Sequence, residues 1–505
     1  MRPRSLLPSL ALLAAMGAVP LLAEEGPSLR TELDFSFLYR YRSSDELVEP
    51  YAYKSGIDLA RNYFDLPPFL RASFDAGGAE GLAIGFEAEA RREFSEDYKD
   101  GYFQETNLAV LGRSGNPLAF EKAAITRGAL YWRSPGLELA LGRDKADYGS
   151  ELEGSLYPST RLPYFDAFRA RGRIGRFGID WMVASMDAIE SWDGIDVNPN
   201  WTENAVAPGI VDDPDSVYNV LEDPAYGFDM DEEPSAIFEV LHRWSWDFGT
   251  FRLGFAENCV LVRRNNRFTL TDFLPVISWH QTSVMPNNVT LLVDLAWEPA
   301  PGLLVAAQGG FDDINGSLVG VGDSEVPTIG ALVAGARYES ASASGALEAY
   351  LEAGYTHYLW GNFSAHTQGS IDDIAPLARA VYRFRLNSGG ALLPLTSPYG
   401  PGALWARLEG GWRFASSSCR VGAELLLLGK NAEANLISTP YDTSAKDGDI
   451  LFFGSLAVPL SWVAGPFELS LAPAALVRDR TWWMEASLGA TYRYRSERAL
   501  RGPRT

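Results

Sequence analysis

The chain has 505 residues, 47% of them hydrophobic, and carries a formal net charge of −22. This acidic balance argues against nucleic acid and anionic lipid surfaces as partners. After the first 23 residues no apolar stretch of 18 residues occurs, so the sequence does not predict a membrane-spanning helix.

The first segment in chain order has the pattern of a secretory signal peptide. Arg2 and Arg4 precede an apolar run over residues 6–22, and no cysteine follows that run closely. A basic start and a short apolar run are typical of exported proteins. We therefore expect residues 1–23 to be a signal peptide and residues 24–505 to form the exported protein.

Segments of alternating apolar and polar residues then recur along the chain. Successive side chains of a strand point to opposite faces, so each segment predicts a strand with one apolar and one polar face. Tight turns join most segments into pairs, and mostly longer loops separate the pairs. The predicted strands are Leu29–Arg42, Leu66–Ala76, Gly81–Glu93, Ile125–Arg133, Leu137–Arg143, Tyr164–Ile174, Phe177–Asp187, Ala236–Trp246, Thr250–Arg263, Asn287–Glu298, Gly302–Asp312, Thr328–Ser340, Ser344–Trp360, Leu404–Ala415, Cys419–Gly429, Asp449–Val463, Phe467–Val477 and Trp482–Arg495.

Short turns at one end and long loops at the other predict a closed antiparallel transmembrane β-barrel, of about 18 strands by this count. We expect it in the cell outer membrane, with outer-membrane lipid and the barrel-insertion machinery as partners. The long extracellular loops are expected near 94–124, 188–235 and 361–403. Residues 377–387 also have a strand-like pattern, and our count treats them as loop content folded inward or over the mouth of the barrel.

The polar face of the predicted strands carries many charged residues. A charge that faces lipid at mid-bilayer costs about 2–4 kcal/mol, so these side chains should face the lumen. There they either form salt bridges that make the barrel rigid or line a hydrated path with selectivity. The lumen charges we single out are Glu87, Glu89, Arg91, Glu348, Glu352, Arg407 and Glu409.

The loop between the seventh and eighth predicted strands is strongly acidic. From Asp187 through Glu233 it has fourteen acidic residues and neither Lys nor Arg. This composition is typical of a solvated outer loop, and divalent cation binding is a weaker hypothesis because no EF-hand spacing is present. Trp192, Trp201 and Tyr218 are interleaved with the acids, as in a sugar-binding surface where a ring covers the apolar face of a pyranose. The alternative is that these rings pack against one another.

Catalytic and metal-binding motifs are absent from the sequence. The four histidines show no zinc-binding spacing and no serine elbow accompanies them. Cys259 and Cys419 fall inside predicted strands far apart in sequence, so we expect small strand residues and no disulfide. The sequence therefore predicts no enzyme, no metal and no cofactor.

Three groups of segments follow one another in order between Leu137 and Asp313. They are Gly142–Gly149 followed by Glu153–Leu156, Phe251–Gly254 leading to Glu257, and Asn287–Glu298 followed by Gly310–Asp313. This series resembles the capsule-assembly Wzi family of outer-membrane barrels, which bind surface polysaccharide. The resemblance implies an eighteen-stranded barrel and a binding role without catalysis. The acidic loop departs from the family pattern. The N-terminal and C-terminal thirds of the chain match the family only in the recurrence of alternating segments.

Two functions remain open from the sequence. The first is a polysaccharide-binding outer-membrane protein, with Arg143, Tyr148, Trp192, Trp201 and Tyr218 as glycan contacts. The second is a porin-like diffusion channel for small hydrophilic solutes, with the charged lumen as its filter. An occluded lumen favours the first function, and a continuous water path favours the second.

Overall fold

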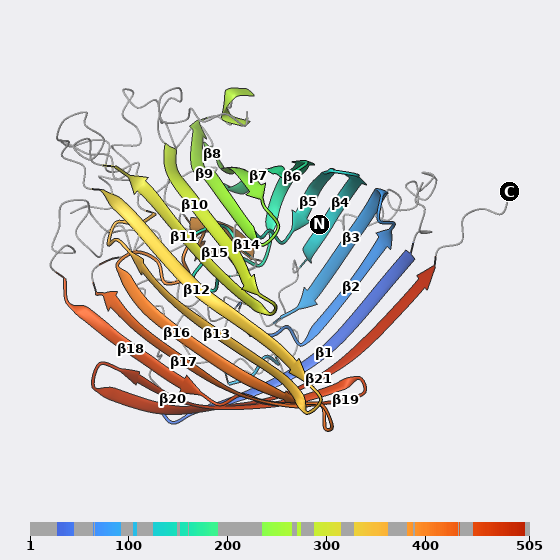
Figure 1. The fold of residues 1–505 in the computed structure, drawn as a ribbon, viewed down its shortest axis with the longest axis vertical. Helices are drawn as coiled ribbons and strands as arrows, with labels where there is room; N and C mark the ends of the chain where they lie inside the picture. The colour runs from blue at the N-terminus through green and yellow to red at the C-terminus, as the bar shows by residue number, and fades with distance from the viewer. Residues whose placement is uncertain are drawn as a thin grey trace, which may run out of the picture.

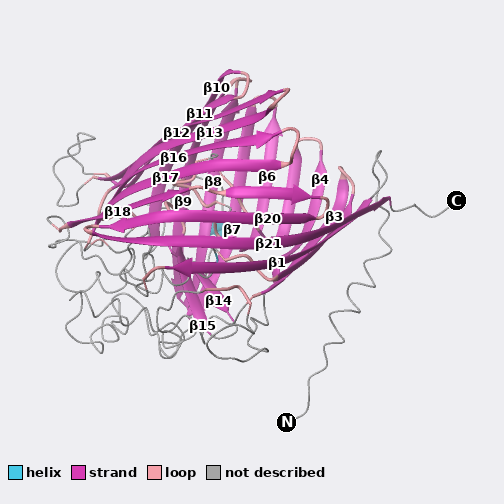
Figure 2. Cartoon of the chain, turned by 90° about the horizontal axis from the view of Figure 1, so that it is seen from below, coloured by secondary structure: helices cyan, strands magenta, loops and turns pink. Residues whose placement is uncertain are grey.

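The computed structural model describes the chain in separate stretches that together form one barrel. The eighteen-stranded antiparallel barrel expected from the strand pattern is confirmed (Figures 1 and 2). The predicted signal peptide and most of the loops expected near 94–124 and 188–235 lie outside the described residues. The described residues are 28–44, 64, 66–91, 105–108, 125–148, 152–159, 161–189, 235–264, 270–273, 287–314, 328–361, 381–386, 389–432, 434 and 448–499.

The barrel strands follow one another in chain order, each paired antiparallel with the next except β18 and β19, which both lie between β17 and β20. They are β1 (Ser28–Arg42), β2 (Leu70–Gly77), β3 (Gly81–Ala90), β4 (Ile125–Ser134), β5 (Leu137–Asp144), β6 (Phe165–Ile174), β7 (Phe177–Ile189), β8 (Ser235–Asp247), β9 (Phe251–Arg264), β10 (Asn287–Ala300), β11 (Leu303–Asp313), β12 (Ile329–Ser342), β13 (Gly345–Thr356), β16 (Ala403–Phe414), β17 (Cys419–Asn431), β18 (Ile450–Ala457), β19 (Leu460–Ala464), β20 (Phe467–Arg478) and β21 (Thr481–Ala499).

Strands β18 and β19 are two parts of one barrel strand. Both pair with β17 on one side and with β20 on the other. Val458 and Pro459 separate them, at a point where the proline ring lacks the N–H that a ladder needs. The predicted strand Asp449–Val463 is therefore present but interrupted.

The ring closes between the first and the last strand. β1 pairs with β21 from Ser28 opposite Ala499 to Arg42 opposite Glu485. Several predicted boundaries differ from the structure by a few residues, and two of these differences have a local cause. Strand β2 begins at Leu70 and not at Leu66, after two prolines that cannot donate to a ladder. Strand β13 ends at Thr356, because the chain then turns, with the Trp360 N–H donating to the His357 carbonyl at 2.9 Å.

The two ends of the barrel differ in their connections, and we call them the short-turn end and the long-loop end. Glycines with positive φ make several of the tight turns, as at Gly302, where φ is 77°. A Cβ at Gly302 would lie 2.0 Å from the Glu339 carbonyl oxygen, so a larger residue does not fit. In an outer membrane the short-turn end faces the periplasm.

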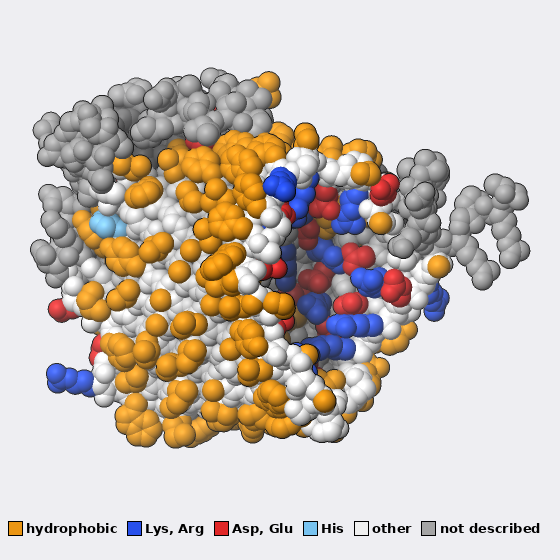
Figure 3. All heavy atoms as spheres, viewed as in Figure 1, with side chains coloured by type: hydrophobic (Ala, Val, Ile, Leu, Met, Phe, Trp, Pro, Cys, Tyr) orange, Lys and Arg blue, Asp and Glu red, His pale blue; other side chains and the backbone are white. Residues whose placement is uncertain are grey.

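The outer wall is apolar, and the inner wall carries the charges. On β21, Leu488 is 52% exposed and points outward, whereas Trp483 is 3% exposed and points inward. Figure 3 shows hydrophobic side chains over the outer wall and a hollow lined with acidic and basic side chains. This alternation is the one expected for a strand between lipid and a polar lumen.

The largest apolar core lies inside the barrel, at the long-loop half. The chain that connects β5 to β6 folds into the lumen, and we call its described residues, within 145–164, the plug segment. Leu156 and Tyr157 are fully buried there, among inward-facing strand residues such as Leu241 and Leu292. Residues 393–402, which we call the second inward segment, join the same core. This core therefore occupies the lumen beside β6 to β18 in this half of the barrel.

The segment that complicated the strand count forms a separate hairpin. Strands β14 (Val381–Leu386) and β15 (Gly389–Pro394) pair only with each other in the described structure. The hairpin lies within the outline of the ring and β14 approaches β7 (Figure 1). Residues 381–386 are thus not a barrel strand. Our strand count likewise treated them as loop content.

Helices contribute little to the described structure. A short 3-10 helix, η3 (Leu270–Phe273), follows β9. Within the described ranges, no helix has the length and apolar character of a membrane span. Cys259 is buried and Cys419 is half-buried, and neither forms a disulfide within the described structure.

Candidate functional site

A buried carboxylate on β13 holds the plug segment. Glu352 has no exposed surface, and both of its carboxylate oxygens lie 2.9 Å from the Gly154 backbone nitrogen, which donates to them. The Trp405 indole donates to the same carboxylate at 2.7 Å, and the Tyr350 hydroxyl donates as well. A buried charge is tolerated when its hydrogen-bonding capacity is met in this way. Glu352 thus ties the plug segment to the wall.

Further contacts hold the plug segment to neighbouring strands. The Gln308 side-chain oxygen, on β11, accepts a hydrogen bond from the Leu156 backbone N–H at 2.7 Å. The Tyr157 hydroxyl donates to Asp294 on β10 at 3.0 Å. Because these partners come from several strands, the plug segment has one defined position in the lumen.

The second inward segment is fixed by buried donors from the wall. The Lys430 ammonium group is fully buried and donates to the carbonyl oxygens of Tyr399, at 3.0 Å, and Pro401. The Thr356 hydroxyl donates to the Gly400 carbonyl at 2.6 Å. The Tyr399 ring lies 4.8 Å from the Trp405 ring, measured between centroids. Both inward segments therefore meet at the Trp405 side chain.

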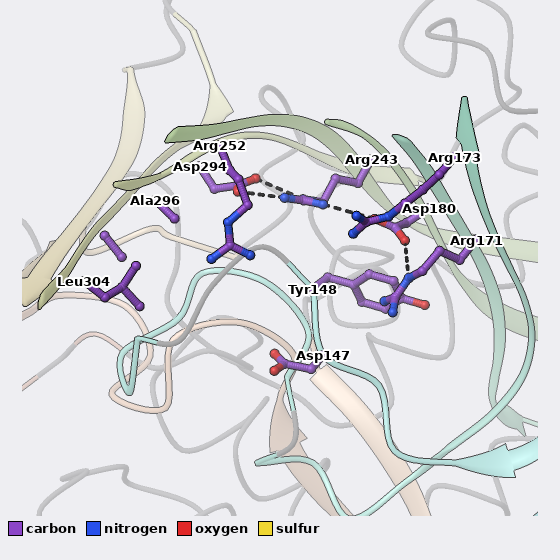
Figure 4. A pocket seen from close by; sticks show the side chains of 11 residues that line it. Asp147, Tyr148, Arg171, Arg173, Asp180, Arg243, Arg252, Asp294, Ala296 and Leu304 are labelled. Carbon is purple, nitrogen blue, oxygen red and sulfur yellow. Dashed lines mark hydrogen bonds and ion pairs between the residues drawn. The ribbon is translucent and has the colours of Figure 1, made fainter. Parts of the chain in front are cut away.

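A cavity of about 210 Å³ lies on the short-turn side of the plug segment, and Figure 4 shows the side chains that line it. Its walls are mostly charged side chains from β6 to β10, and Tyr148 belongs to the plug segment. It is lined by Asp147, Tyr148, Arg171, Arg173, Asp180, Arg243, Arg252, Asp294, Ala296, Leu304 and Ala306.

Arg243 is the central ion-pair donor of this cavity. Its guanidinium group donates to Asp294 at 2.8 and 3.0 Å and to Asp180 at 3.0 Å. Arg171 also donates to Asp180, at 2.6 Å. The two aspartates are therefore neutralised by Arg243 and Arg171.

Two other arginines of the cavity have weaker partners or none. No acidic side chain of the described residues lies within ion-pair distance of Arg173. The nearest acid to Arg252 is Glu298 at 3.8 Å, and both side chains are about half exposed, at 43% and 57%. Exposed pairs of this kind contribute little. The cavity consequently has an excess of positive charge inside a strongly acidic chain.

A second cavity, of about 450 Å³, opens on another part of the short-turn end. Its charges are paired, as in Arg127 with Asp75 and Arg133 with Glu138, each pair at 2.8 Å. Four arginines and three acidic side chains line it, the same formal balance as in the first cavity, but each of its arginines has an acidic partner within 3.5 Å. As for metals, the part of the chain that the structure describes contains no group of three or more His, Cys, Asp or Glu placed to hold an ion.

The structure places two of the predicted glycan contacts, and the others lie outside its described residues. Arg143 donates twice to Asp166, at 2.7 Å each, and its guanidinium carbon lies 3.9 Å from the centre of the Tyr164 ring. Tyr148 is inside the lumen and lines the first cavity. Burial raises the pKa of Tyr148, so its hydroxyl stays protonated and can donate. Trp192, Trp201 and Tyr218 are among the residues not described.

Six of the seven lumen charges named from the sequence lie on inward-facing strand positions. The seventh, Arg91, directly follows the last residue of β3. Glu89 pairs with Arg91 at 2.7 Å, and Glu348 pairs with Arg420 at 3.1 Å and also with Arg413. The remaining contacts are Thr126 with Glu87 at 2.8 Å, Arg407 with Glu409, and the plug contacts of Glu352. Most of these charges thus form local pairs, and Glu352 has the separate role of binding the plug segment.

Sequence reasoning missed the plug segment and the arginines of the first cavity. A signal for the arginines was present, since Arg169, Arg171 and Arg173 alternate along β6 and so share one face. A signal for the plug segment was weaker. Inward positions near the long-loop end carry apolar residues such as Met182 and Leu241, which a water-filled lumen would not need.

Comparison with known proteins supports the fold. No protein-family model and no curated protein sequence matches the chain. Among solved structures, the chain is similar to Wzi, a carbohydrate-binding β-barrel involved in group 1 capsule assembly in Escherichia coli. The TM-score is 0.52 at 12% identity, over 92% of this chain and 83% of that one.

Two solved outer-membrane proteins of Pseudomonas aeruginosa are more distant. OpdK has a TM-score of 0.42 at 10% identity, over 93% of this chain and 99% of its own. OccK9 has a TM-score of 0.43 at 12% identity, over 93% and 98%. By its closed ring of strands and its similarity to Wzi, the chain has the fold of outer-membrane β-barrel proteins.

Proposed function

We propose that this chain binds or anchors surface polysaccharide at the cell outer membrane and does not serve as an open diffusion channel. The observation that carries the proposal is the apolar core inside the lumen, with the plug segment tied to Glu352 across it. Hydrophilic solutes need a continuous water path, and a packed apolar core does not supply one. The similarity to Wzi, a carbohydrate-binding barrel, also supports the proposal of polysaccharide binding.

With this core in the lumen, the glycan contacts are expected at the outer loops. We assign them to Trp192, Trp201 and Tyr218, because rings interleaved with carboxylates suit a pyranose. Arg143 and Tyr148 are engaged at the end of β5 and inside the lumen, so we leave them out of the contact set.

One observation favours a porin-like channel as the alternative function. The short-turn half of the barrel is hollow and lined by charges of both signs (Figure 3). A channel for small hydrophilic solutes would have this character along its whole length.

Conductance in planar lipid bilayers separates the two functions. We expect the purified full chain to insert without stable open-channel steps. As the matched control, a variant in which residues 149–162 are replaced by a short Gly/Ser linker should give steps. Stable steps from the unmodified chain would support the porin-like alternative and contradict the proposal.

Polysaccharide retention on cells tests the binding role. Changing Trp192 and Trp201 together to Ala removes two apolar faces, each contributing on the order of 1–2 kcal/mol when covered by a sugar ring. Retained capsule or exopolysaccharide should fall while the folded barrel stays abundant. Trp297→Ala, on the exposed outer wall, is the control and should leave retention unchanged.

A further inference from the structure

We propose that the cavity on the short-turn side of the plug segment binds a small molecule of one sugar ring that carries a carboxylate and enters from the short-turn end. Arg173 and Arg252 would hold the carboxylate. This site is separate from the outer loops, so the inference does not rest on the polysaccharide proposal.

The charge distribution is the first argument. Asp180 and Asp294 are already paired with Arg243 and Arg171, within 3.0 Å in every case. Arg173 and Arg252 line the same cavity without a close acidic partner among the described residues. Two guanidinium groups that line one partly open cavity repel each other, and an anion bound between them offsets that repulsion. A planar guanidinium group also matches a carboxylate in geometry.

The shape and the remaining walls point to one sugar-sized ring. A volume of about 210 Å³ is below the roughly 300–1,000 Å³ of sites for drug-sized ligands. Ala296, Leu304 and Ala306 form an apolar strip on one wall, where the C–H face of a ring can pack. Asp147 lies across from Arg252, and the Tyr148 side chain extends from the plug segment with its hydroxyl toward Arg171, where it can donate to a ring hydroxyl (Figure 4).

The net charge of the cavity favours a singly charged ligand. Four arginines and three aspartates line it, so one monocarboxylate balances the formal excess of positive charge, whereas a dianion such as phosphate exceeds it. An aldohexuronate has the ring, the hydroxyls and the single charge that these walls accommodate. The Tyr148 side of the cavity belongs to the plug segment, so the ligand binds there and does not continue into the apolar core.

Titration calorimetry on the full chain in detergent tests the site, with glucuronate as the probe. We expect glucuronate to bind at least tenfold more tightly than glucose, which has the same ring without the charge. Arg173→Ser and Arg252→Ser should each weaken glucuronate binding at least fivefold. Arg30→Ser is the matched control, because Arg30 is an exposed arginine of the second cavity, and it should leave the affinity unchanged.

Several results would overturn the inference. Equal affinity for glucose and glucuronate would remove the role of the arginines, and tighter binding of inorganic phosphate would remove the preference for a monocarboxylate. An Arg30→Ser effect equal to that of Arg252→Ser would mean that positive charge in general, and not this cavity, attracts glucuronate. The variant with Trp192 and Trp201 changed to Ala should bind glucuronate normally, so failure of this site and failure of the polysaccharide proposal are distinguishable.

Discussion

The backbone N–H of Gly154 donates to both oxygens of the Glu352 carboxylate, 2.9 Å from each. Gly154 belongs to the loop between β5 and β6, whereas Glu352 lies on β13, almost opposite in the ring of strands. This contact therefore ties the plug segment to the far wall of the lumen. Its strength governs how firmly the plug segment is held there.

Replacing Gly154 by Ala should loosen the plug segment without unfolding the barrel. A Cβ at this position would lie 2.4 Å from the Trp405 ring and 2.8 Å from the Glu352 carboxylate, so the segment must shift. Such overpacking costs about 1–3 kcal/mol. Hydrogen exchange of residues 152–159 should become faster. Gly410→Ala is the control, since a Cβ there meets nothing within 4 Å; equal exchange in both variants would contradict the expectation.

Replacing Glu352 by Gln should weaken the same attachment through lost acceptors. The amide offers one acceptor oxygen in place of two, while the donors from Gly154, Trp405 and Tyr350 remain buried around it. An unsatisfied buried donor costs about 1–3 kcal/mol. The melting temperature of the folded band in heat-modifiability gels should fall. Glu348→Gln, whose side chain is 31% exposed, should lower it less, and an equal fall would show that the burial of Glu352 is unimportant.

Replacing Arg243 by Met should destabilise the barrel wall strongly. The change leaves Asp180 and Asp294 without their shared cation, and both carboxylates are buried. Removing one partner of a buried pair costs about 3–5 kcal/mol. Chemical denaturation in phospholipid vesicles measures the free energy of unfolding. Arg133→Met, from an exposed pair with Glu138, should cost only about 0–1 kcal/mol, and similar losses in both variants would refute the difference.

Replacing Leu488 by Arg should reduce barrel assembly. Leu488 is exposed on the outer wall of β21, where a charge at mid-bilayer costs about 2–4 kcal/mol. The heat-modifiable folded fraction should decrease. Ala474→Arg provides the control on the neighbouring strand, because Ala474 is the register partner of Glu485 on the inward face. A normal folded fraction for Leu488→Arg would mean that this position does not face lipid.

The strands were predictable because their signal is local. Alternation along segments such as Phe467–Val477 and the turn at Gly465 depend only on neighbouring residues, and they gave the strand order. The interruption at Pro459 also had a local sign, the missing N–H, although the alternation continues across it. The same local rules gave residues 377–387 a strand-like pattern but could not say whether they belong to the ring; the described part, residues 381–386, pairs with residues 389–394 outside it.

The plug segment was not predictable by those rules because its partners are distant in sequence. Leu156 and Tyr157 have no strand periodicity, and they are placed by Gln308 and Asp294, which lie on other strands. Alternation assigns a side chain to the inside of a barrel but does not say what it meets there. For this reason Glu352 was identified as a lumen charge and its attachment to Gly154 was not.

The pairing of β1 with β21 has a consequence for the order of folding. Ser28 and Ala499 lie at opposite ends of the described chain, and folding slows as the sequence separation of contacting residues grows. On this ground we expect ring closure to follow the local pairings, such as that of β5 with β6. A chain that stops before β21 leaves the edges of β1 and β20 unpaired in lipid, where unpaired backbone groups are not tolerated. The final nineteen-residue strand thus supplies the pairing that removes both open edges.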